Sequence, residues 1–201
     1  MGPKGQQTKQ KILETAAIMF WKYNYHGITV DQIVEQAQVN KASFYQYFGS
    51  KENAAQEAMQ YMYESTLSYA FKYSFAEYSD PLDRLESIFK RIYNNHRRIK
   101  RNEKRCPGCP FVNMGNELAT VNEDMRKVVS KIFQGFHAYH TQIYNDAWEQ
   151  GIATIEWNPK KVGRRMQSIL NGGMTSAKIH NSPEEILDAL DSACRLIGIQ
   201  R

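Results

Sequence analysis

The sequence has no long apolar run and no apolar segment at its N-terminus. No stretch approaches the roughly 18 apolar residues that cross a bilayer, and the opening MGPKGQQTKQ lacks the apolar centre of a secretion signal. Gln6 occupies the position at which a myristoylation signal requires Ser or Thr. We therefore expect a cytoplasmic protein without a membrane partner.

Cysteines are few, and strand patterns are missing. Three cysteines in 201 residues, without an export signal, argue against a disulfide framework. No sustained alternation of apolar and polar residues appears, whereas nearly every segment repeats its apolar residues at helical spacing. The sequence therefore predicts an all-α fold, and it indicates no cofactor.

Positive charge is in modest excess, and it is concentrated in two blocks. The formal net charge is +5 and the isoelectric point is near 9.0. Residues 1–51 hold six lysines against three acidic residues, and residues 84–105 hold nine Lys or Arg against two Glu. A basic balance of this kind favours a polyanion partner such as nucleic acid.

Capping residues and prolines divide the chain into about nine helices. The first is expected from about residue 8 to before Gly27, two short ones at 30–37 and 41–48, and a long one from 51 into the seventies. Five more are expected to begin near residues 81, 111, 122, 159 and 183. For the last of these, Ser182, Pro183 and Glu185 predict a capping box with proline at the first helical position.

The two short helices have the dimensions of a helix-turn-helix. Thr29 with Gln32 forms a capping-box pattern, and Asn40 is the expected cap of the second short helix. In that second helix, KASFYQYF, Phe44 and Phe48 are four residues apart and share a face, which we assign to the core. The other sides of the helix are then left for contact with a partner.

In a helix-turn-helix, the start of the second helix enters the major groove, where small or hydrogen-bonding side chains reach base edges. Hydroxyls and cations nearby suit phosphates. Spacing alone equally allows the tyrosines to pack into the core, the threonine to serve only as a cap and the lysine after the helix to be solvated. The expected DNA contacts are Thr29, Lys41, Ala42, Ser43, Tyr45, Tyr47 and Lys51.

The run ITVDQIVEQAQVNKASFYQYFGSKEN resembles the N-terminal signature of TetR/AcrR-type transcriptional regulators, over about residues 8–60. The resemblance implies a homodimer whose helix-turn-helix domains, residues 1–50, bind a palindromic operator. It also implies a repressor that is released by a small molecule, with residues 51–201 as the effector-binding and dimerisation domain and the last two helices as the dimer bundle. Asn40 departs from the Ser or Thr that is usual there.

The expected effector-binding residues are aromatic or polar side chains at helical spacing in the second half of the chain. The same pattern is typical of an ordinary bundle core. The set consists of Phe111, Asn113, Met114, Phe133, Phe136, His137, His140, Tyr144 and Trp148.

The stretch RNEKRCPGCPF holds Cys106 and Cys109 in a Cys-x-x-Cys. This is half of a zinc site, but no second pair completes it, so no metal is expected. Cations before the motif and a helix after it favour a reactive thiolate. GCPFVNMGNELA also resembles a stretch in electrophile- or oxidant-responsive TetR-type regulators, which places the sensor at Cys109, with Cys106 and Lys178 as its neighbours.

Three other interpretations of the chain remain open at this stage. The cysteines fit a plain turn in which they act as small apolar residues. A Cys-x-x-Cys redox enzyme is the alternative function, although its motif belongs after a strand in a βαβ unit. A helix-turn-helix protein that serves as an interaction scaffold is a further possibility. The prediction is a DNA-binding regulator and not an enzyme.

Overall fold

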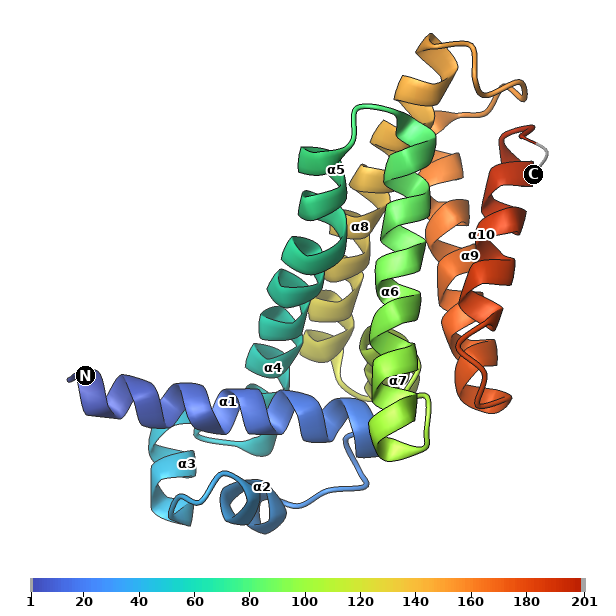
Figure 1. The fold of residues 1–201 in the computed structure, drawn as a ribbon. Helices are drawn as coiled ribbons and strands as arrows, with labels where there is room; N and C mark the ends of the chain where they lie inside the picture. Colours follow the sequence, from blue (N-terminus) through green and yellow to red (C-terminus); the bar gives the residue numbers. More distant parts are fainter. Residues whose placement is uncertain (1, 200–201) are drawn as a thin grey trace. The chain divides into compact units, whose positions relative to one another are not determined.

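The computed structural model describes residues 2–199, and within that range it contains nine continuous helices and no strand (Figure 1). The all-α prediction is confirmed. No helix in the described range is long and apolar enough to span a membrane. The helices are α1 Pro3–Tyr23, α2 Val30–Gln36, α3 Lys41–Phe48, α4 Lys51–Thr66 continued by η1 Leu67–Lys72 and α5 Tyr73–Glu77, α6 Pro81–Glu103, α7 Pro110–Leu118, α8 Glu123–Glu149, α9 Pro159–Ile179 and α10 Glu185–Leu196.

The long helix after α3 contains a π-helical stretch but no break. Thr66 and Lys72 keep right-handed helical dihedral angles at the two junctions, so α4, η1 and α5 form one helix. Inside it, the Ser74 hydroxyl lies 2.6 Å from the carbonyl oxygen of Ala70 and 2.8 Å from the Ser87 hydroxyl of α6. The expectation of one helix from residue 51 into the seventies is therefore confirmed.

The chain packs into two compact units, and each combines segments that are distant in sequence. Residues 2–65 and 110–132 form the first unit, and residues 66–109 and 133–199 form the second. The predicted boundary at residue 50 divides the chain by function and not by packing, so it stays a prediction. The helix-turn-helix thus shares a compact unit with α7 and the first part of α8.

The first unit is held by apolar side chains that α1, α2, α3 and α4 turn toward one another. Ile12, Phe20, Ile33, Phe44 and Met59 are each 0 or 1% exposed. α1 packs against α2, α3 and α7. Burial of such side chains stabilises the unit by about 1.5–3 kcal/mol each. This core holds the two short helices in a fixed arrangement.

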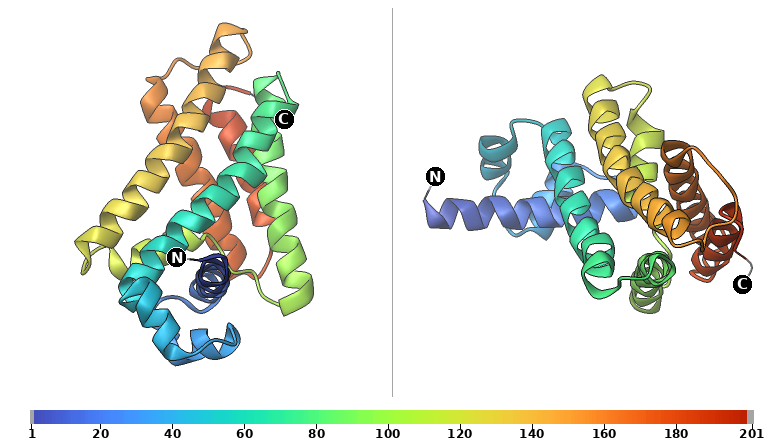
Figure 2. Two further views of the ribbon diagram at one scale, coloured as in Figure 1. Left: turned by 90° about the vertical axis from the view of Figure 1, so that its left-hand side faces the viewer. Right: turned by 90° about the horizontal axis from the view of Figure 1, so that it is seen from above.

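The second unit is a bundle in which α9 and α10 lie side by side, as both views show (Figures 1 and 2), and α6 packs against α10. A Cβ added at Gly173 of α9 would lie 2.6 Å from the Cβ of Ala189 and 3.0 Å from the carbonyl oxygen of Glu185. A Cβ added at Gly172 would meet nothing within 4 Å. Only Gly173 is therefore required by the close approach of α9 and α10.

Two helix starts differ from prediction. α1 begins at Pro3, about five residues early, because proline at the first helical position favours initiation there. α10 begins at Glu185 and not near Pro183, so the capping box predicted at Ser182 is wrong. The Ser182 hydroxyl instead donates a hydrogen bond to the Glu184 carboxylate at 2.7 Å. The Ile186 N–H donates to the carbonyl oxygen of Pro183, three residues earlier, as in a tight turn.

Candidate nucleic-acid interface and thiol site

The two caps of the helix-turn-helix form as predicted. The Thr29 side chain accepts a hydrogen bond from the Gln32 N–H at 3.3 Å, and the Gln32 side chain accepts one from the Thr29 N–H at 2.8 Å. Asn40 Oδ1 accepts from the Ser43 N–H at 2.7 Å. Because each bond satisfies an N–H that the first helical turn leaves free, these local contacts determine where α2 and α3 start.

α3 has one buried face and one exposed face. Phe44 and Phe48 are 0 and 4% exposed, and their ring centroids are 5.4 Å apart. Lys41 and Ala42 are exposed and Ser43 is half-buried at the start of the helix. Small and hydrogen-bonding side chains therefore stand in front of an apolar face that anchors the helix, as insertion into a DNA groove requires.

The predicted phosphate contacts differ in how available they are. Tyr45 is 46% exposed, Tyr47 is half-buried and Thr29 is exposed. Lys41 Nζ is 2.8 Å from the Asp31 carboxylate, and this hydrogen-bonded ion pair raises the pKa of Lys41. DNA would have to replace that pairing.

Lys51 is not simply solvated. Its Nζ donates to the carbonyl oxygens of Tyr25 at 2.7 Å and Ile28 at 2.5 Å, and it lies 4.1 Å from the centroid of the Tyr25 ring. Burial lowers its pKa. Lys51 therefore ties the start of α4 to the loop that precedes α2, in addition to any contact with DNA.

The same loop is held from the other side by Glu117 of α7, a residue that sequence reasoning missed. Its carboxylate accepts hydrogen bonds from the N–H groups of Tyr25 at 2.6 Å and His26 at 3.3 Å. The Tyr25 hydroxyl donates to Glu52 of α4 at 2.8 Å, and burial together with this carboxylate raises the pKa of Tyr25. No local signal marks a partner 92 residues away.

The cysteine turn lies in a closely packed part of the second unit. The thiols of Cys106 and Cys109 are buried, with the two residues 4 and 3% exposed. Burial raises the pKa of Cys106, although the charge of Lys100 acts in the opposite direction. Reactive thiols are usually partly exposed. Modification of either sulfur in this state would therefore require local opening of the turn.

Lys178 lies beside this turn. A Cβ added at Gly108 would be 3.1 Å from Lys178 Cδ and 3.4 Å from the Met174 carbonyl oxygen. Gly108 has a φ of +74°, in the region that favours glycine. The stem of Lys178 therefore packs against the residue that precedes Cys109, while the residue as a whole is exposed.

Two further residues hold the turn, and neither belongs to a sequence motif. The buried His96 places Nε2 3.3 Å from the Gly108 carbonyl oxygen and Nδ1 2.9 Å from that of Ile92, and burial lowers its pKa. Asn181 Oδ1 accepts from the Cys106 N–H at 3.0 Å. An asparagine just after a predicted helix is a sequence signal that could have pointed to Asn181, which has a φ of 51°.

The predicted effector residues fall in both compact units. Phe111 and Met114, on α7 of the first unit, are each 2% exposed, and Asn113 is half-buried. In the second unit Phe133 and His137 are half-buried, with ring centroids 6.4 Å apart.

At the far end of α8, Tyr144 uses its hydroxyl to bind the backbone before α9. Its oxygen accepts from the Trp157 N–H at 2.7 Å. Trp148 is 43% exposed and stacks on Tyr144. These two predicted effector residues thus have structural contacts of their own.

His140 is the most unusual of the predicted effector residues. It is 0% exposed, and its ring packs edge-on against Phe71 and lies near Phe136, whose ring stacks on Phe71. Its Nε2 is 3.2 Å from the Gln167 side-chain oxygen, and Nδ1 has no hydrogen-bond partner among the described residues. Burial lowers its pKa to about 4, so the ring is neutral.

Comparisons with known proteins assign both parts of the chain. Residues 12–58 match the profile of bacterial regulatory proteins of the tetR family, and residues 81–193 match that of the tetracyclin repressor-like C-terminal domain. The chain belongs to the TetR family. The prediction made from residues 28–53 is thereby confirmed, and the protein is a DNA-binding transcriptional regulator.

Individual TetR-family relatives span most of the chain. The uncharacterized HTH-type transcriptional regulator YxaF of Bacillus subtilis is 29% identical over 83% of both chains. The HTH-type transcriptional repressor NemR of Escherichia coli K12 is 25% identical over 95% of this chain and 94% of its own. The crystal structure of reduced E. coli NemR has the same fold, with a TM-score of 0.82 at 22% identity over 94% of this chain and 96% of that one.

These relatives are regulators and not enzymes. The redox-enzyme interpretation of the Cys-x-x-Cys gains no support from them. In the structure, no strand within residues 2–199 precedes the motif, and no group of three or more possible metal ligands was found in that range.

Proposed function

We propose that this TetR-family protein is a repressor that binds a palindromic operator as a homodimer and releases it when a small molecule or a thiol modification acts on the helices after α4. The presentation of α3 is the observation that supports DNA binding most directly. Lys41, Ala42 and Ser43 lie at the exposed start of a helix that Phe44 and Phe48 anchor from behind. A repressor of chromosomal genes acts in the cytoplasm.

The roles at the DNA surface follow from exposure and chemistry. Lys41, Ala42 and Ser43 contact base edges, and the remaining predicted residues contact phosphates: Thr29, Tyr45, Tyr47 and Lys51. Because Lys51 also holds the loop before α2 through two carbonyl oxygens, its ammonium group both positions α2 and attracts the DNA backbone. Residues 1–50 form the DNA-binding domain in this proposal, and residues 51–201 the regulatory and dimerisation domain, with α9 and α10 as the dimer contact.

α7 offers a connection between an effector and the helix-turn-helix inside the first unit. It carries the buried Phe111 and Met114 on the same helix as Glu117, whose carboxylate binds the N–H groups of Tyr25 and His26. A shift of α7 would therefore move or release the loop that leads into α2. A ligand acts through such a shift only if it binds the two positions of α7 with different affinity.

His140 supports an effector that donates a hydrogen bond. Gln167 donates its amide Nε2 to Asn171 at 2.9 Å, so its oxygen faces His140 Nε2–H. The neutral ring then leaves the Nδ1 lone pair without a donor, which costs about 1–3 kcal/mol in a buried site. A small molecule with a hydroxyl or amine at this place would satisfy that lone pair.

Thiol modification is the second route to release, with Cys109 as the sensor and Cys106 and Lys178 as its neighbours. Cys109 immediately precedes α7 in the chain. Its burial means that an added group does not fit the present packing and would displace the turn. Modification of this thiol would thereby act on α7 directly.

The DNA-binding proposal is tested by footprinting the purified protein on the DNA upstream of its own gene and of the neighbouring genes. We expect a two-fold-symmetric protected site whose affinity falls steeply with salt, because several cations displace counterions. Two variants at Tyr47 are compared with the parent protein. Tyr47→Phe removes only the hydroxyl and is the matched control for Tyr47→Ala, which removes the ring as well. Absence of any protected site would contradict the proposal.

The thiol route is tested on the preformed DNA complex by adding an electrophile such as N-ethylmaleimide. We expect Cys109→Ser to resist release. Cys106→Ser, three residues earlier in the same turn and also buried, should release as the parent does. If the Cys109→Ser variant dissociates from DNA at the parent rate, Cys109 is not the sensor. That result would not contradict the proposal that the protein binds an operator.

A further inference from the structure

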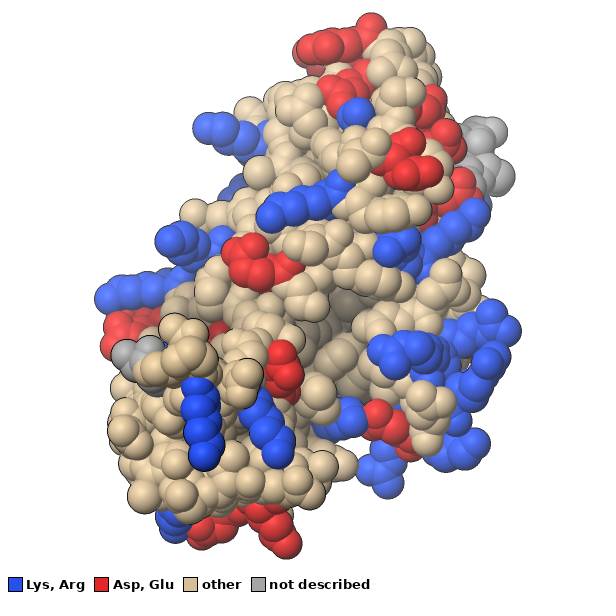
Figure 3. Space-filling view, turned by 60° about the vertical axis from the view of Figure 1, so that its left-hand side comes forward, with Lys and Arg blue, Asp and Glu red and all other residues tan. Residues whose placement is uncertain are grey.

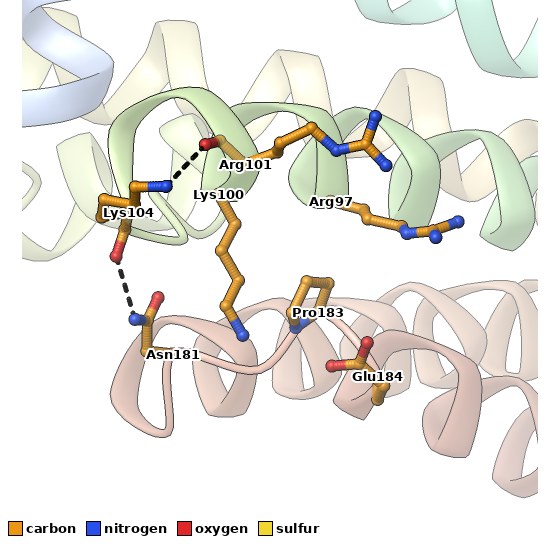
Figure 4. Close-up of a pocket in the computed structure, with 7 residues that line it drawn as sticks. All are labelled: Arg97, Lys100, Arg101, Lys104, Asn181, Pro183 and Glu184. Carbon is orange, nitrogen blue, oxygen red and sulfur yellow. Dashed lines mark hydrogen bonds between the residues drawn. The ribbon is translucent and has the colours of Figure 1, made fainter.

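An open pocket lies between the C-terminal end of α6 and the turn before α10 (Figure 4). Its volume is about 520 Å³, which falls in the range of small-molecule sites. The α10 side contributes Asn181, Pro183 and Glu184. The α6 side contributes only cations: Arg97, Lys100, Arg101 and Lys104.

Three of the four cations, Arg97, Lys100 and Arg101, lie on one face of α6 at i, i+3 and i+4. Lys104 follows as the C-cap of α6, in the left-handed conformation. Like charges at these spacings repel one another and destabilise a helix. In the space-filling view, Lys and Arg side chains gather in a group with few acidic side chains among them (Figure 3).

Two cations elsewhere on α6 form ion pairs with carboxylates, whereas Lys104 of the pocket donates to the backbone carbonyl oxygen of Arg101 at 3.3 Å. Arg84 pairs with Asp146 at 2.5 Å and Lys90 with Glu86 at 2.7 Å. Within residues 2–199, none of the four pocket cations has a carboxylate within ion-pair distance. The single acidic group in the wall is Glu184, so the pocket carries a net charge of about +3 at neutral pH.

Glu184 responds to this charge. Its pKa is lowered, first by the hydrogen bond from the Ser182 hydroxyl and its own backbone N–H, and then by the charges of Lys100 and Arg97. The carboxylate is therefore ionised and neutralises one of the four cations. The remaining charge favours a ligand that brings at least two negative charges of its own.

The floor of the pocket is preformed. Asn181 Nδ2 donates to the Lys104 carbonyl oxygen at 3.0 Å, and Asn181 Oδ1 accepts from the Cys106 N–H. Asn181 and Lys104 both have positive φ, at 51° and 64°. These bonds join the end of α6 to the α9–α10 turn, so a ligand meets a wall that does not have to be ordered on binding.

We propose that this pocket binds a small oxyanion with two or more negative charges, in the class of phosphorylated or polycarboxylate metabolites. Arginine presents a planar fork that binds carboxylate or phosphate oxygens in pairs, and lysine adds a point charge. The site shares no residue with α3 or with the surroundings of His140, and it does not depend on the proposed repressor function. A concave wall that includes Glu184 suits a free anion better than the phosphates of a DNA duplex.

The test is isothermal titration of the full-length protein with inorganic pyrophosphate and with citrate, against sodium chloride at equal ionic strength. We expect saturable binding of one oxyanion per chain. Lys100→Gln should weaken it about tenfold, since a charge-assisted contact is lost, whereas Glu184→Gln should strengthen it. Arg98→Gln is the matched control, because Arg98 carries the same charge on the same helix but donates to Asn95 outside the pocket.

Two results would overturn the proposal. The first is the absence of saturable binding, or an equal loss for Arg98→Gln and Lys100→Gln, which would indicate general surface charge. The second is a lower salt dependence of DNA binding for Lys100→Gln with unchanged pyrophosphate affinity, which would mean that these cations contact DNA phosphates. Melting temperatures equal to that of the parent verify that each variant is folded.

Discussion

The helix-turn-helix and the turn at residues 105–110 use opposite arrangements of their functional side chains. On α3 the candidate DNA contacts lie on the surface, while local caps at Thr29 and Asn40 determine the backbone. At the turn, both thiols are buried, and the backbone is held by His96 of α6 and by Asn181 of the α9–α10 turn. The first region therefore presents its candidate contacts to solvent, whereas the second keeps its thiols covered.

The difference extends to what each region tolerates. Exposed side chains on the DNA-facing side of α3 can be substituted with little change in the free energy of unfolding, because the contacts that hold the helix are on its buried side. A buried turn or a close helix pair has no such freedom, because every added atom displaces a neighbour. Substitutions in the two regions should therefore separate into effects on binding and effects on stability.

The largest expected effect lies in the second unit, at Gly173. Gly173→Ala places a Cβ 2.6 Å from that of Ala189, so we expect the free energy of unfolding to fall by about 2 kcal/mol. Gly172→Ala is the control on the same helix: it meets nothing within 4 Å and should raise the free energy of unfolding by about 1 kcal/mol through helix propensity. Urea denaturation measures both, and equal effects would contradict the close approach of α9 and α10.

Lys51 is expected to be an exception to this separation between effects on binding and effects on stability, because this candidate DNA contact also has a structural role. Lys51→Met loses the hydrogen bonds to the Tyr25 and Ile28 carbonyl oxygens, which should lower the free energy of unfolding by about 2 kcal/mol. Operator affinity should fall at every sequence. Lys41→Met, at an exposed site, should weaken DNA binding without a measurable change in unfolding. If Lys51→Met leaves stability unchanged, the carbonyl contacts are not formed in solution.

The buried histidine, His140, gives the stability of the second unit a pH dependence. The pKa of His140 is about 4 in the folded protein and near 6.5 when unfolded, so the unfolded state takes up the proton first as pH falls. Stability is therefore full above pH 6.5 and is lost toward pH 4. Between pH 7 and pH 5, this group should lower the free energy of unfolding by about 2 kcal/mol.

The measurement compares urea denaturation at the two pH values for the parent and for His140→Gln. The variant should show a smaller drop by about that same amount, 2 kcal/mol. An unchanged pH dependence in His140→Gln would show that another group carries it.

The smallest expected effect concerns sequence preference. Ser43→Ala removes a hydroxyl at the start of α3 while its N–H keeps the Asn40 cap. We expect preference at one base pair of each half-site to relax by about 1 kcal/mol, or fivefold, with stability unchanged. Binding selection with randomised operators measures this, and a uniform loss at all sequences would place Ser43 on the phosphates.

The parts of the fold that were predicted correctly are those that depend on near neighbours in the chain. Thr29, Asn40, Asn122 and Asn158 each accept a backbone hydrogen bond within three residues, so their patterns are visible without any tertiary information. The prediction at Ser182 was wrong because its hydroxyl found the Glu184 carboxylate instead. Local sequence patterns thus predict which segments are helical more accurately than they predict the first residue of each helix.

The candidate sites divide in the same way. The residues of α3 were found because the spacing of Phe44 and Phe48 separates a buried face from an exposed one. Glu117, His96 and Asn181 were missed because their partners are 92, 12 and 75 residues away in sequence. Such hydrogen bonds form only when the helices pack together, and the spacing of apolar residues in the sequence does not predict them.

The sequence by itself determined the all-α class, the helix-turn-helix, the buried face of α3 and the block of positive charge at residues 84–105, because helical geometry and end-capping act over a few residues. Only the tertiary structure decided that Cys106 and Cys109 are buried, that Lys51 and Glu117 hold one loop from two sides, and that the α6 cations line a pocket. These features depend on which helices meet, and that is determined by packing across the whole chain.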